Sequence, residues 1–295
     1  MARRLVAAPT GKTAVVPSRR VLEYGMYRTI VERVTISLPR LPQEFDGTTV
    51  AVVSDIHAGP GRARTARARR TVEIVKSLTP DIIVLPGDTV HAVRDADACL
   101  SALSELDAPY GIWASLGNHE HGFVWFSKYV GTAPELSVDQ WRGVYGEVGI
   151  ELLVNEARSI VRNGARIWLL GVDDAYSGRD DLAATLDAVE TDAFRLAITH
   201  SPDLLDDPRV GEVDLVVAGH THGGQVRIPG LGPLWAPCRR PRERSVGLIR
   251  ANGTLMYVTR GAGEGTPLRL FCPREVTLMT LTNAAPSGAG SSVIP

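Results

Sequence analysis

Residues 49–57 have the sequence TVAVVSDIH, in which a short apolar run ends directly at Ser54, Asp55 and His57. Apolar runs of this length are typical of strands that are buried on both faces, as in a parallel sheet. Further runs share this character and also end at small or polar residues: 81–85, 112–116, 167–170, 195–199 and 214–218. The chain is therefore predicted to form an α/β fold built on buried strands.

The segments between the first of these strands have helical periodicity. Val72, Val75 and Leu78 recur at roughly helical spacing within residues 65–78, and Pro80 ends the pattern. Residues 96–106, before the third strand, have a similar pattern. The second half is predicted to be richer in β-structure, with short runs at 226–228, 246–249, 255–259 and 276–281.

The composition is that of a folded globular chain. Of its 295 residues, 44% are hydrophobic and 22% are charged, and this balance excludes both a disordered and a fibrous chain. The 32 Lys and Arg residues against 33 Asp and Glu residues give a formal net charge of −1. That charge excludes a nucleic-acid binder that depends on bulk positive charge.

Cysteine usage and hydropathy favour a cytoplasmic protein. The sequence has three scattered cysteines, Cys99, Cys238 and Cys272. Three are too few for a disulfide framework, which indicates a reducing compartment. The apolar stretch after Arg3 and Arg4 is broken before it reaches signal-peptide length. No run reaches the roughly 18 apolar residues of a transmembrane helix.

The informative polar residues lie where the predicted strands end. The motifs there are Asp55-Ile56-His57, Gly87-Asp88, Gly117-Asn118-His119-Glu120, Thr199-His200 and Gly219-His220-Thr221-His222. Ligands bind outside the carboxyl ends of the strands in open α/β sheets, so these groups are expected to converge. In a chain of this composition, chance gives a Gly-His-x-His match only about 0.02 times and an Asp-x-His match about 0.4 times. The ordered set as a whole therefore carries the signal.

Imidazole and carboxylate groups in one crevice suggest divalent metal ions. Neutral imidazole nitrogen and carboxylate oxygen suit Mn, Fe, Zn or Co, and no thiolate is present to favour a structural zinc site. A shared carboxylate can bridge two such ions at about 3.5–4 Å, which activates water and clamps a phosphate. His220 and His222 are expected to point the same way on an extended segment, so that each could serve one ion of a pair.

The order of these motifs resembles the calcineurin-like metallophosphoesterase superfamily. Within it, the chain is similar to the bacterial YaeI/YkuE-type phosphodiesterase branch, on the basis of residues 198–203 (ITHSPD), 219–225 (GHTHGGQ) and 257–261 (YVTRG), and of Leu41-Pro42 before Phe45-Asp46-Gly47. The likeness extends from about Val34 to about Leu281. We therefore predict an N-terminal extension that is partly ordered (1–33), a metallophosphoesterase domain (34–283) and a disordered tail (284–295).

This resemblance implies a four-layer α/β/β/α sandwich with a dinuclear metal site. By matching position, the first ion would be held by Asp55, His57 and His222. Asp88 would bridge both ions, and the second ion would be held by Asn118, His200 and His220. His119 would stabilise the transition state or protonate the leaving oxygen.

Other polar residues lie near the motifs without belonging to the predicted ligand set. Arg227 and Arg260 lie in segments that the resemblance places near the crevice, where a guanidinium could bind a phosphate oxygen. His91 and His121 are expected to be imidazoles of the rim or the surface. Asp173 and Asp174 are expected to form a turn, with a bond to a ligand residue as the alternative. Five arginines within Arg62–Arg70 are expected to lie on a solvated helix.

The predicted function is that of a dinuclear metal-dependent phosphoesterase, with Mn as the leading metal and attack of a metal-held hydroxide on a phosphodiester. One alternative is a hydrolase of lipid-linked pyrophosphates, such as a nucleotide-activated lipid precursor. Its membrane-facing parts would be the Arg62–Arg70 cluster and residues 15–36. The protein would then be cytoplasmic but bound to the membrane surface. A second alternative is a non-catalytic metal-binding scaffold. No specific nucleic-acid partner is expected.

Overall fold

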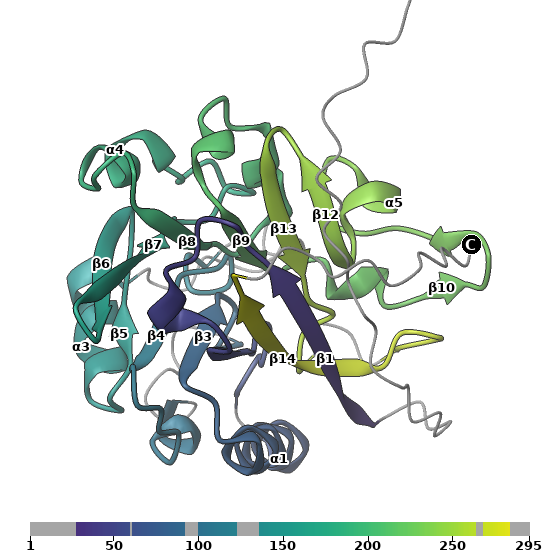
Figure 1. Cartoon of the computed structure of the whole chain (residues 1–295). Helices are drawn as coiled ribbons and strands as arrows, with labels where there is room; N and C mark the ends of the chain where they lie inside the picture. The colour runs from purple at the N-terminus through teal and green to yellow at the C-terminus, as the bar shows by residue number, and fades with distance from the viewer. Residues whose placement is uncertain (1–27, 60, 92–99, 123–135, 264–267, 284–295) are drawn as a thin grey trace, which may run out of the picture.

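Two six-stranded sheets form the centre of the fold in the computed structural model (Figure 1), which describes residues 28–59, 61–91, 100–122, 136–263 and 268–283. The first sheet contains, in spatial order, β1 (Thr29–Ser37), β14 (Arg274–Thr282), β2 (Thr49–Val52), β3 (Ile82–Pro86), β4 (Ile112–Ser115) and β5 (Glu151–Leu152). The second contains β12 (Gly247–Ala251), β13 (Thr254–Val258), β9 (Leu215–Ala218), β8 (Phe194–Ile198), β7 (Ala165–Gly171) and β6 (Glu156–Arg162).

The central strands of both sheets run parallel. In the first sheet β2, β3, β4 and β5 pair in parallel, whereas β14 is antiparallel to β2. In the second sheet β7, β8, β9 and β13 are parallel, and the edge strands β6 and β12 are antiparallel to their neighbours. Because the carboxyl ends of parallel strands meet at one edge of a sheet, the loops that follow them gather there.

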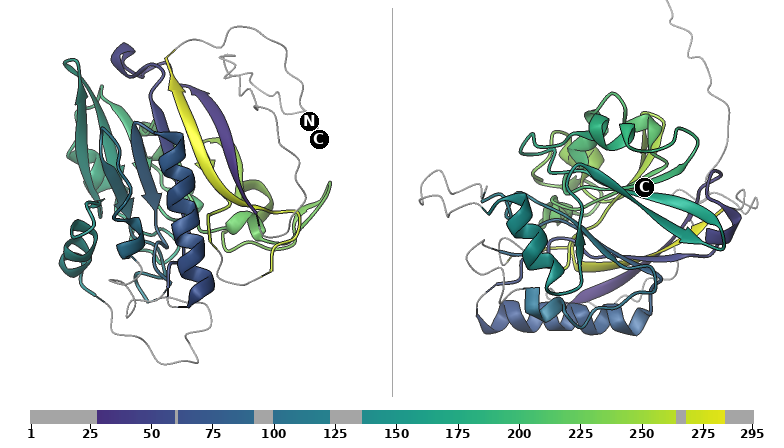
Figure 2. Two further views of the ribbon diagram at one scale, coloured as in Figure 1. Left: turned by 90° about the horizontal axis from the view of Figure 1, so that it is seen from below. Right: turned by 90° about the vertical axis from the view of Figure 1, so that its left-hand side faces the viewer.

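Three apolar cores hold four layers together. The core between the sheets includes Phe45, Val84 and Leu215, all fully buried. A second core lies between the first sheet and a helical layer of α1 (Arg62–Leu78), η3 (Ser101–Leu103) and α3 (Val138–Gly146). A third lies between the second sheet and α4 (Leu182–Asp187), η5 (Pro202–Asp206) and η6 (Val210–Glu212). The helical layers lie on opposite sides of the two sheets (Figure 2), which confirms the predicted α/β/β/α sandwich.

The apolar runs of the sequence become β2, β3, β4, β7, β8 and β9, with bounds that differ by one or two residues from those predicted. Helix α1 starts at Arg62, three residues before the predicted helix. Within the predicted helix 96–106, residues 101–103 form the short helix η3, and residues 96–99 lie outside the described residues. In the second half, β10 (Arg227–Ile228), β12, β13 and β14 correspond to the predicted short runs.

Some elements had no clear signal in the sequence. Strand β6 has the sequence EARSIVR and is an edge strand on which only Ile160 is buried, so its polar composition hides it. Strand β1 starts at Thr29, which means that the end of the predicted extension 1–33 belongs to the first sheet. Residues 1–27 and the predicted tail 284–295 lie outside the described residues.

The arginine cluster of residues 62–70 lies on α1, where Arg62, Arg69 and Arg70 are exposed and Arg70 pairs with Glu73 at 2.9 Å. The buried face of the helix carries Ala68, Thr71, Val72 and Val75. This arrangement matches the expected solvated helix. No helix in the described part of the chain is both long and apolar enough to cross a membrane.

Candidate metal centre

Three groups of potential metal ligands are present in the described residues, and the two that are fully buried lie side by side in the loops at the carboxyl ends of the strands; the third combines His57 with His91 and His119. Each of the two buried groups holds three residues whose ligand atoms all lie within 4.8 Å of one another. The first group is Asp55, His57 and His222, and the second group is Asp88, His200 and His220. Residues 55, 57 and 88 follow strands of the first sheet, and residues 200, 220 and 222 follow strands of the second.

Asp88 lies between the two groups. Its Oδ2 atom is 3.8 Å from His57 Nε2 in the first group and 3.3 Å from His200 Nε2 in the second. The same oxygen is 3.9 Å from Nε2 of His119. A single carboxylate oxygen thus faces imidazoles of both groups, which is the arrangement that a bridging ligand needs.

Asn118 joins the second group. Its Oδ1 atom is 3.1 Å from His200 Nε2, and Nδ1 of His220 is 3.0 Å from the same nitrogen. In the first group, Nε2 of His222 is 3.2 Å from His57 Nε2 and 3.6 Å from Asp55 Oδ1. All seven side chains predicted as ligands therefore converge on one site.

The backbone at this site is strained. Asp55, His57, Asp88, His220 and His222 all have φ angles between 47° and 66°. Side chains other than glycine rarely occupy this left-handed region, and such residues concentrate at functional sites where the surrounding structure holds them in place. Residues 220–222 are therefore not the extended segment that the sequence predicted, because Thr221 has right-handed helical angles and His222 begins the short helix η7 (His222–Gly224).

Two motif glycines are required because side chains of the site approach them closely. A Cβ atom at Gly117 would lie 2.3 Å from Asp88 Oδ1, and one at Gly219 would lie 1.9 Å from Ser54 Oγ. Neither distance leaves room for a methyl group. The glycines of the Gly-Asn-His-Glu and Gly-His-x-His motifs thus allow the two sheets to meet around the site.

Hydrogen bonds to backbone carbonyls fix the direction of two imidazoles. Nδ1 of His200 is 2.9 Å from the carbonyl oxygen of Pro86, and Nδ1 of His119 is 2.8 Å from that of His91. A carbonyl can only accept, so each Nδ1 carries the proton. Each Nε2 is left facing Asp88, in the manner in which outer hydrogen bonds orient metal-bound histidines.

Glu120 holds together the loops that carry Asp88 and Gly117. Its carboxylate accepts hydrogen bonds from the backbone N–H groups of Asp88, Gly117 and Val90 at 2.9–3.1 Å, and Tyr145 donates its hydroxyl at 3.3 Å. Burial raises the pKa of Glu120. The side chain therefore ties the loop after β3 to the loop after β4, a role that the motif did not reveal in the sequence.

Three of the four histidines predicted as ligands are in the neutral form. Burial lowers the pKa of His57, His220 and His222 well below the usual histidine range, and neighbouring cationic side chains add to the effect. Burial also raises the pKa of Asp55 to about 6. Neutral imidazole is the form that binds metal.

Asp88 and His200 form the exception as a buried ion pair. Burial opposes a charge on both groups, but His200 and then His119 outweigh it and hold the pKa of Asp88 well below its usual value. Asp88 in turn outweighs burial at His200 and raises the pKa of that imidazole well above its usual value. Of the four histidines predicted as ligands, His200 is therefore the one that is charged at neutral pH when no metal is bound.

The residues present fit a pair of divalent ions. Asp55 Oδ1 is buried and has no hydrogen-bond partner among the described residues, although a buried carboxylate oxygen normally has one. It faces Nε2 of His222, and that nitrogen faces Nε2 of the equally neutral His57. Imidazole and oxygen donors without thiolate suit Mn, Fe, Zn or Co.

Metal uptake at pH 7 is expected to release about one proton per chain, because His200 is the one imidazole that must lose a proton before it can bind an ion. Affinity should therefore rise with pH as His200 is deprotonated. Calorimetric titrations with Mn in buffers of different ionisation enthalpy measure this number. In His200→Gln the release should fall to near zero, whereas a release of about three protons or more would contradict the neutral state of the other imidazoles.

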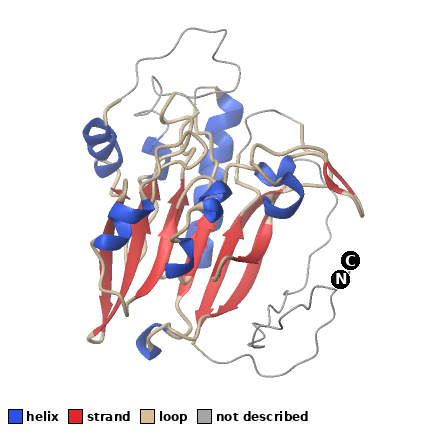
Figure 3. Cartoon of the chain, turned by 90° about the horizontal axis from the view of Figure 1, so that it is seen from above, coloured by secondary structure: helices blue, strands red, loops and turns tan. Residues whose placement is uncertain are grey.

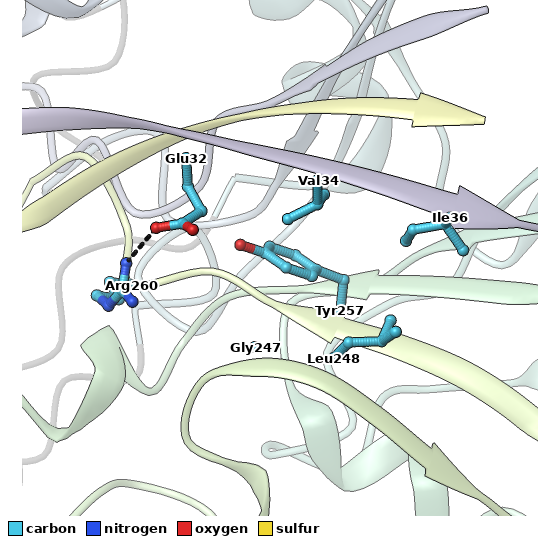
Figure 4. Close-up of a pocket in the computed structure, with 7 residues that line it drawn as sticks. All are labelled: Glu32, Val34, Ile36, Gly247, Leu248, Tyr257 and Arg260. Carbon is cyan, nitrogen blue, oxygen red and sulfur yellow. Dashed lines mark hydrogen bonds and ion pairs between the residues drawn. The ribbon is translucent and has the colours of Figure 1, made fainter. Parts of the chain in front are cut away.

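Arg260 and Arg227, the predicted substrate contacts, are engaged within the protein. Arg260 pairs with Glu275 and, at 3.5 Å, with Glu32, and it lines a pocket of about 160 Å³ between β1 and β13 (Figure 4). Arg227 donates to the carbonyl oxygen of Gly223 at 2.8 Å and to Ser245 Oγ at 3.2 Å. A phosphate oxygen would have to compete with these partners.

The structure corrects the prediction for His121. Its ring is buried, not on the rim or surface, and Nε2 lies 2.7 Å from Asp173 Oδ1. Asp174 accepts hydrogen bonds from the N–H groups of Tyr176 and Ser177, as expected for a turn. His91 is half-buried, and its ring centroid lies 5.4 Å from that of His119. His91 therefore lies beside the ligand groups, whereas His121 is held by Asp173.

Arg269 is a residue of the site that no sequence pattern indicated. Its buried guanidinium donates to the carbonyl oxygens of Arg260 and Gly263, and Nη2 lies 3.3 Å from Nδ1 of His222. Arg269 therefore holds the loop after β13 against the His222 imidazole. An isolated arginine between apolar residues gives no sequence signal, because its contacts depend on the fold.

The chain was compared with known proteins. Residues 48–224 match the family described as calcineurin-like phosphoesterase. The chain is 29% identical over 282 residues to a putative metallophosphoesterase of Caenorhabditis elegans, covering 88% of this chain but only 54% of the relative. It is 28% identical to the metallophosphoesterase YkuE of Bacillus subtilis (89% and 88% covered) and 32% identical to the phosphodiesterase YaeI of Escherichia coli (68% and 70% covered). The chain therefore belongs to the calcineurin-like metallophosphoesterase family.

Proposed function

We propose that this protein is a dinuclear metal-dependent phosphoesterase with phosphodiesters as its main substrates. The observation that carries this proposal is the position of Asp88 Oδ2, which faces His57 on one side and His200 on the other. A carboxylate placed in this way between two ligand groups supports a pair of ions instead of a single one.

The proposed ligand assignment follows the two groups. One ion would be held by Asp55, His57 and His222, and the other by Asn118, His200 and His220, with Asp88 shared. The chemistry that such a pair supplies when bound is activation of water and neutralisation of the charge on a phosphate. Mn is proposed as the leading metal, and the nitrogen and oxygen donors are also compatible with Fe, Zn or Co.

His119 is proposed as the general acid. Its Nδ1–H donates to the carbonyl oxygen of His91, so the ring is fixed with Nε2 on the side of the ligand groups. A protonated Nε2 could donate to the leaving oxygen of an ester held there.

The preference for diesters is supported by the similarity to YaeI, which is named a phosphodiesterase. The direct test is to reconstitute the purified chain with Mn, count the bound ions and assay bis(p-nitrophenyl) phosphate beside p-nitrophenyl phosphate. We expect about two ions per chain and faster cleavage of the diester, abolished by a chelator. Less than about one ion per chain and no cleavage would overturn the proposal. Bound metal without turnover on a broad panel of phosphoesters would favour the scaffold alternative.

A further inference from the structure

Exposed apolar side chains concentrate on two short segments of the described structure. Apart from Val31 and Val161, every large apolar residue that is exposed there lies within residues 228–235 or 268–271. Between 38% and 63% of each of these side chains is exposed. We call this set the apolar tip; it consists of Ile228, Leu231, Leu234, Trp235, Leu268, Leu270 and Phe271.

The two segments form one surface. Strand β10 pairs with β11 (Gly232–Pro233) in a hairpin, and residues 226 and 270 form a parallel bridge beside it. The N–H of Arg227 donates to the carbonyl oxygen of Leu270 at 3.0 Å, and Gln225 Nε2 donates to that of Leu268 at 3.1 Å. The hairpin extends away from the two sheets (Figures 1 and 3).

The apolar tip borders the metal centre. Arg269 points inward to His222, whereas its neighbours Leu268 and Leu270 are exposed. On the hairpin side, a Cβ atom at Gly224, two residues after His222, would lie 2.4 Å from Pro233 Cβ. A partner that binds the apolar tip would therefore lie next to the ligand groups.

Arginine predominates among the charged residues around the tip. Residues 226–242 contain no Asp or Glu, but they contain Arg227, Arg239, Arg240 and Arg242. The last three are exposed and lie at or just before α5 (Pro241–Arg244), which packs beside β11. Arg239 pairs with Asp206 at 3.2 Å and Arg240 pairs with Glu243 at 3.4 Å, and both guanidinium groups stay exposed. The hairpin carries apolar side chains at its end and arginines behind them. This combination fits a partner that has an apolar interior and an anionic surface.

We infer that the apolar tip docks on the surface of an anionic phospholipid bilayer. Leucine and phenylalanine side chains would enter the boundary between headgroups and acyl chains, Trp235 would lie at the headgroup level, and the arginines would contact lipid phosphates. A second copy of the chain is a poorer occupant because a symmetric contact would bring these arginines against one another.

This inference uses a different part of the molecule from the membrane contact predicted from the sequence. The arginines of residues 62–70 lie on α1, which covers the outer face of the first sheet. Docking by the tip would instead bring the metal centre close to lipid headgroups. That consequence, which points to lipid phosphoesters as substrates, rests on the proposed function; the docking itself does not.

Sedimentation with vesicles tests the docking without any assay of activity. The full chain is mixed with vesicles of phosphatidylcholine alone or mixed with phosphatidylglycerol, and the partition coefficient is measured. Leu231→Ser/Leu234→Ser/Phe271→Ser should lower the partition coefficient for the anionic vesicles at least about tenfold. The control Val161→Ser removes an equally exposed apolar residue from β6 and should leave it unchanged.

A second pair of variants tests the charge. Arg240→Gln/Arg242→Gln should weaken binding to anionic vesicles about tenfold or more and reduce its salt dependence. The matched change on α1, Arg62→Gln/Arg69→Gln, should have no such effect. Thermal unfolding midpoints confirm that each variant is folded.

Several outcomes would overturn the inference. They are absence of binding to anionic vesicles by the full chain, equal binding by the triple serine variant, and loss of binding in the α1 variant alone. Self-association without lipid that the serine substitutions abolish would assign the tip to a second copy. Because vesicle binding and phosphoester cleavage are measured separately, a failure of docking leaves the proposed function standing, and the reverse also holds.

Discussion

Asp88→Asn is expected to lower phosphodiester cleavage by at least about 1,000-fold, since a change of several kcal/mol in electrostatic stabilisation is at stake. The substitution keeps the shape of the side chain and removes its charge. Asp88 Oδ1 accepts a hydrogen bond from the N–H of His119 at 2.9 Å, and an amide oxygen can keep that bond. The oxygen that faces both ligand groups would be replaced by an NH₂ group, which cannot bind a cation.

The measurements for this variant are the turnover of bis(p-nitrophenyl) phosphate and the metal content. We expect the bound metal to fall below two ions per chain, because the shared ligand is lost. Asp174→Asn is the matched control: it makes the same chemical change at a buried carboxylate that serves a nearby turn. Activity of Asp88→Asn within about tenfold of the wild type would contradict the bridging assignment.

His119→Ala is expected to reduce cleavage in a way that depends on the leaving group. General acid catalysis contributes about 100- to 10,000-fold when the leaving oxygen needs a proton. A diester with an alkyl leaving group should lose activity in that range. A p-nitrophenyl ester should lose far less, because its leaving group departs as a stable anion.

The comparison of the two esters makes this result specific. His121→Ala serves as the control, since it removes a neighbouring buried imidazole that bonds to Asp173. Metal content should be unchanged in His119→Ala. Equal losses for both esters together with loss of metal would show that His119 is a ligand, in line with its place beside His57 and His91.

The sequence predicted which polar residues meet at this site, but it did not predict the contacts that hold them in place. Asp55, Asp88 and His220 could be found because side-chain type and order at strand ends are visible in a single sequence. The contact of Arg269 with His222 could not, since it joins residues whose proximity depends on the packing of the loops. His121 was misplaced for the same reason: its partner Asp173 lies 52 residues away along the chain.

The fold shows the same division. Buried strands such as β3 and β9 were visible as apolar runs, because both of their faces lie against other layers. Strand β6 was not, because a half-exposed edge strand needs few apolar residues. The parallel pairing of β1 with β14 joins the two ends of the described chain and leaves no local pattern.

The origin of the ligands in two sheets links metal affinity to the mechanics of the whole fold. Residues 55, 57, 88 and 118 come from loops of the first sheet, and residues 200, 220 and 222 come from loops of the second. Ions held between them would act as a removable cross-link at one end of the sandwich, because separation of the sheets would tear the ligand set apart. By thermodynamic linkage, bound metal would then raise the free energy needed to separate the two halves, by an amount set by the metal affinity and the free metal concentration.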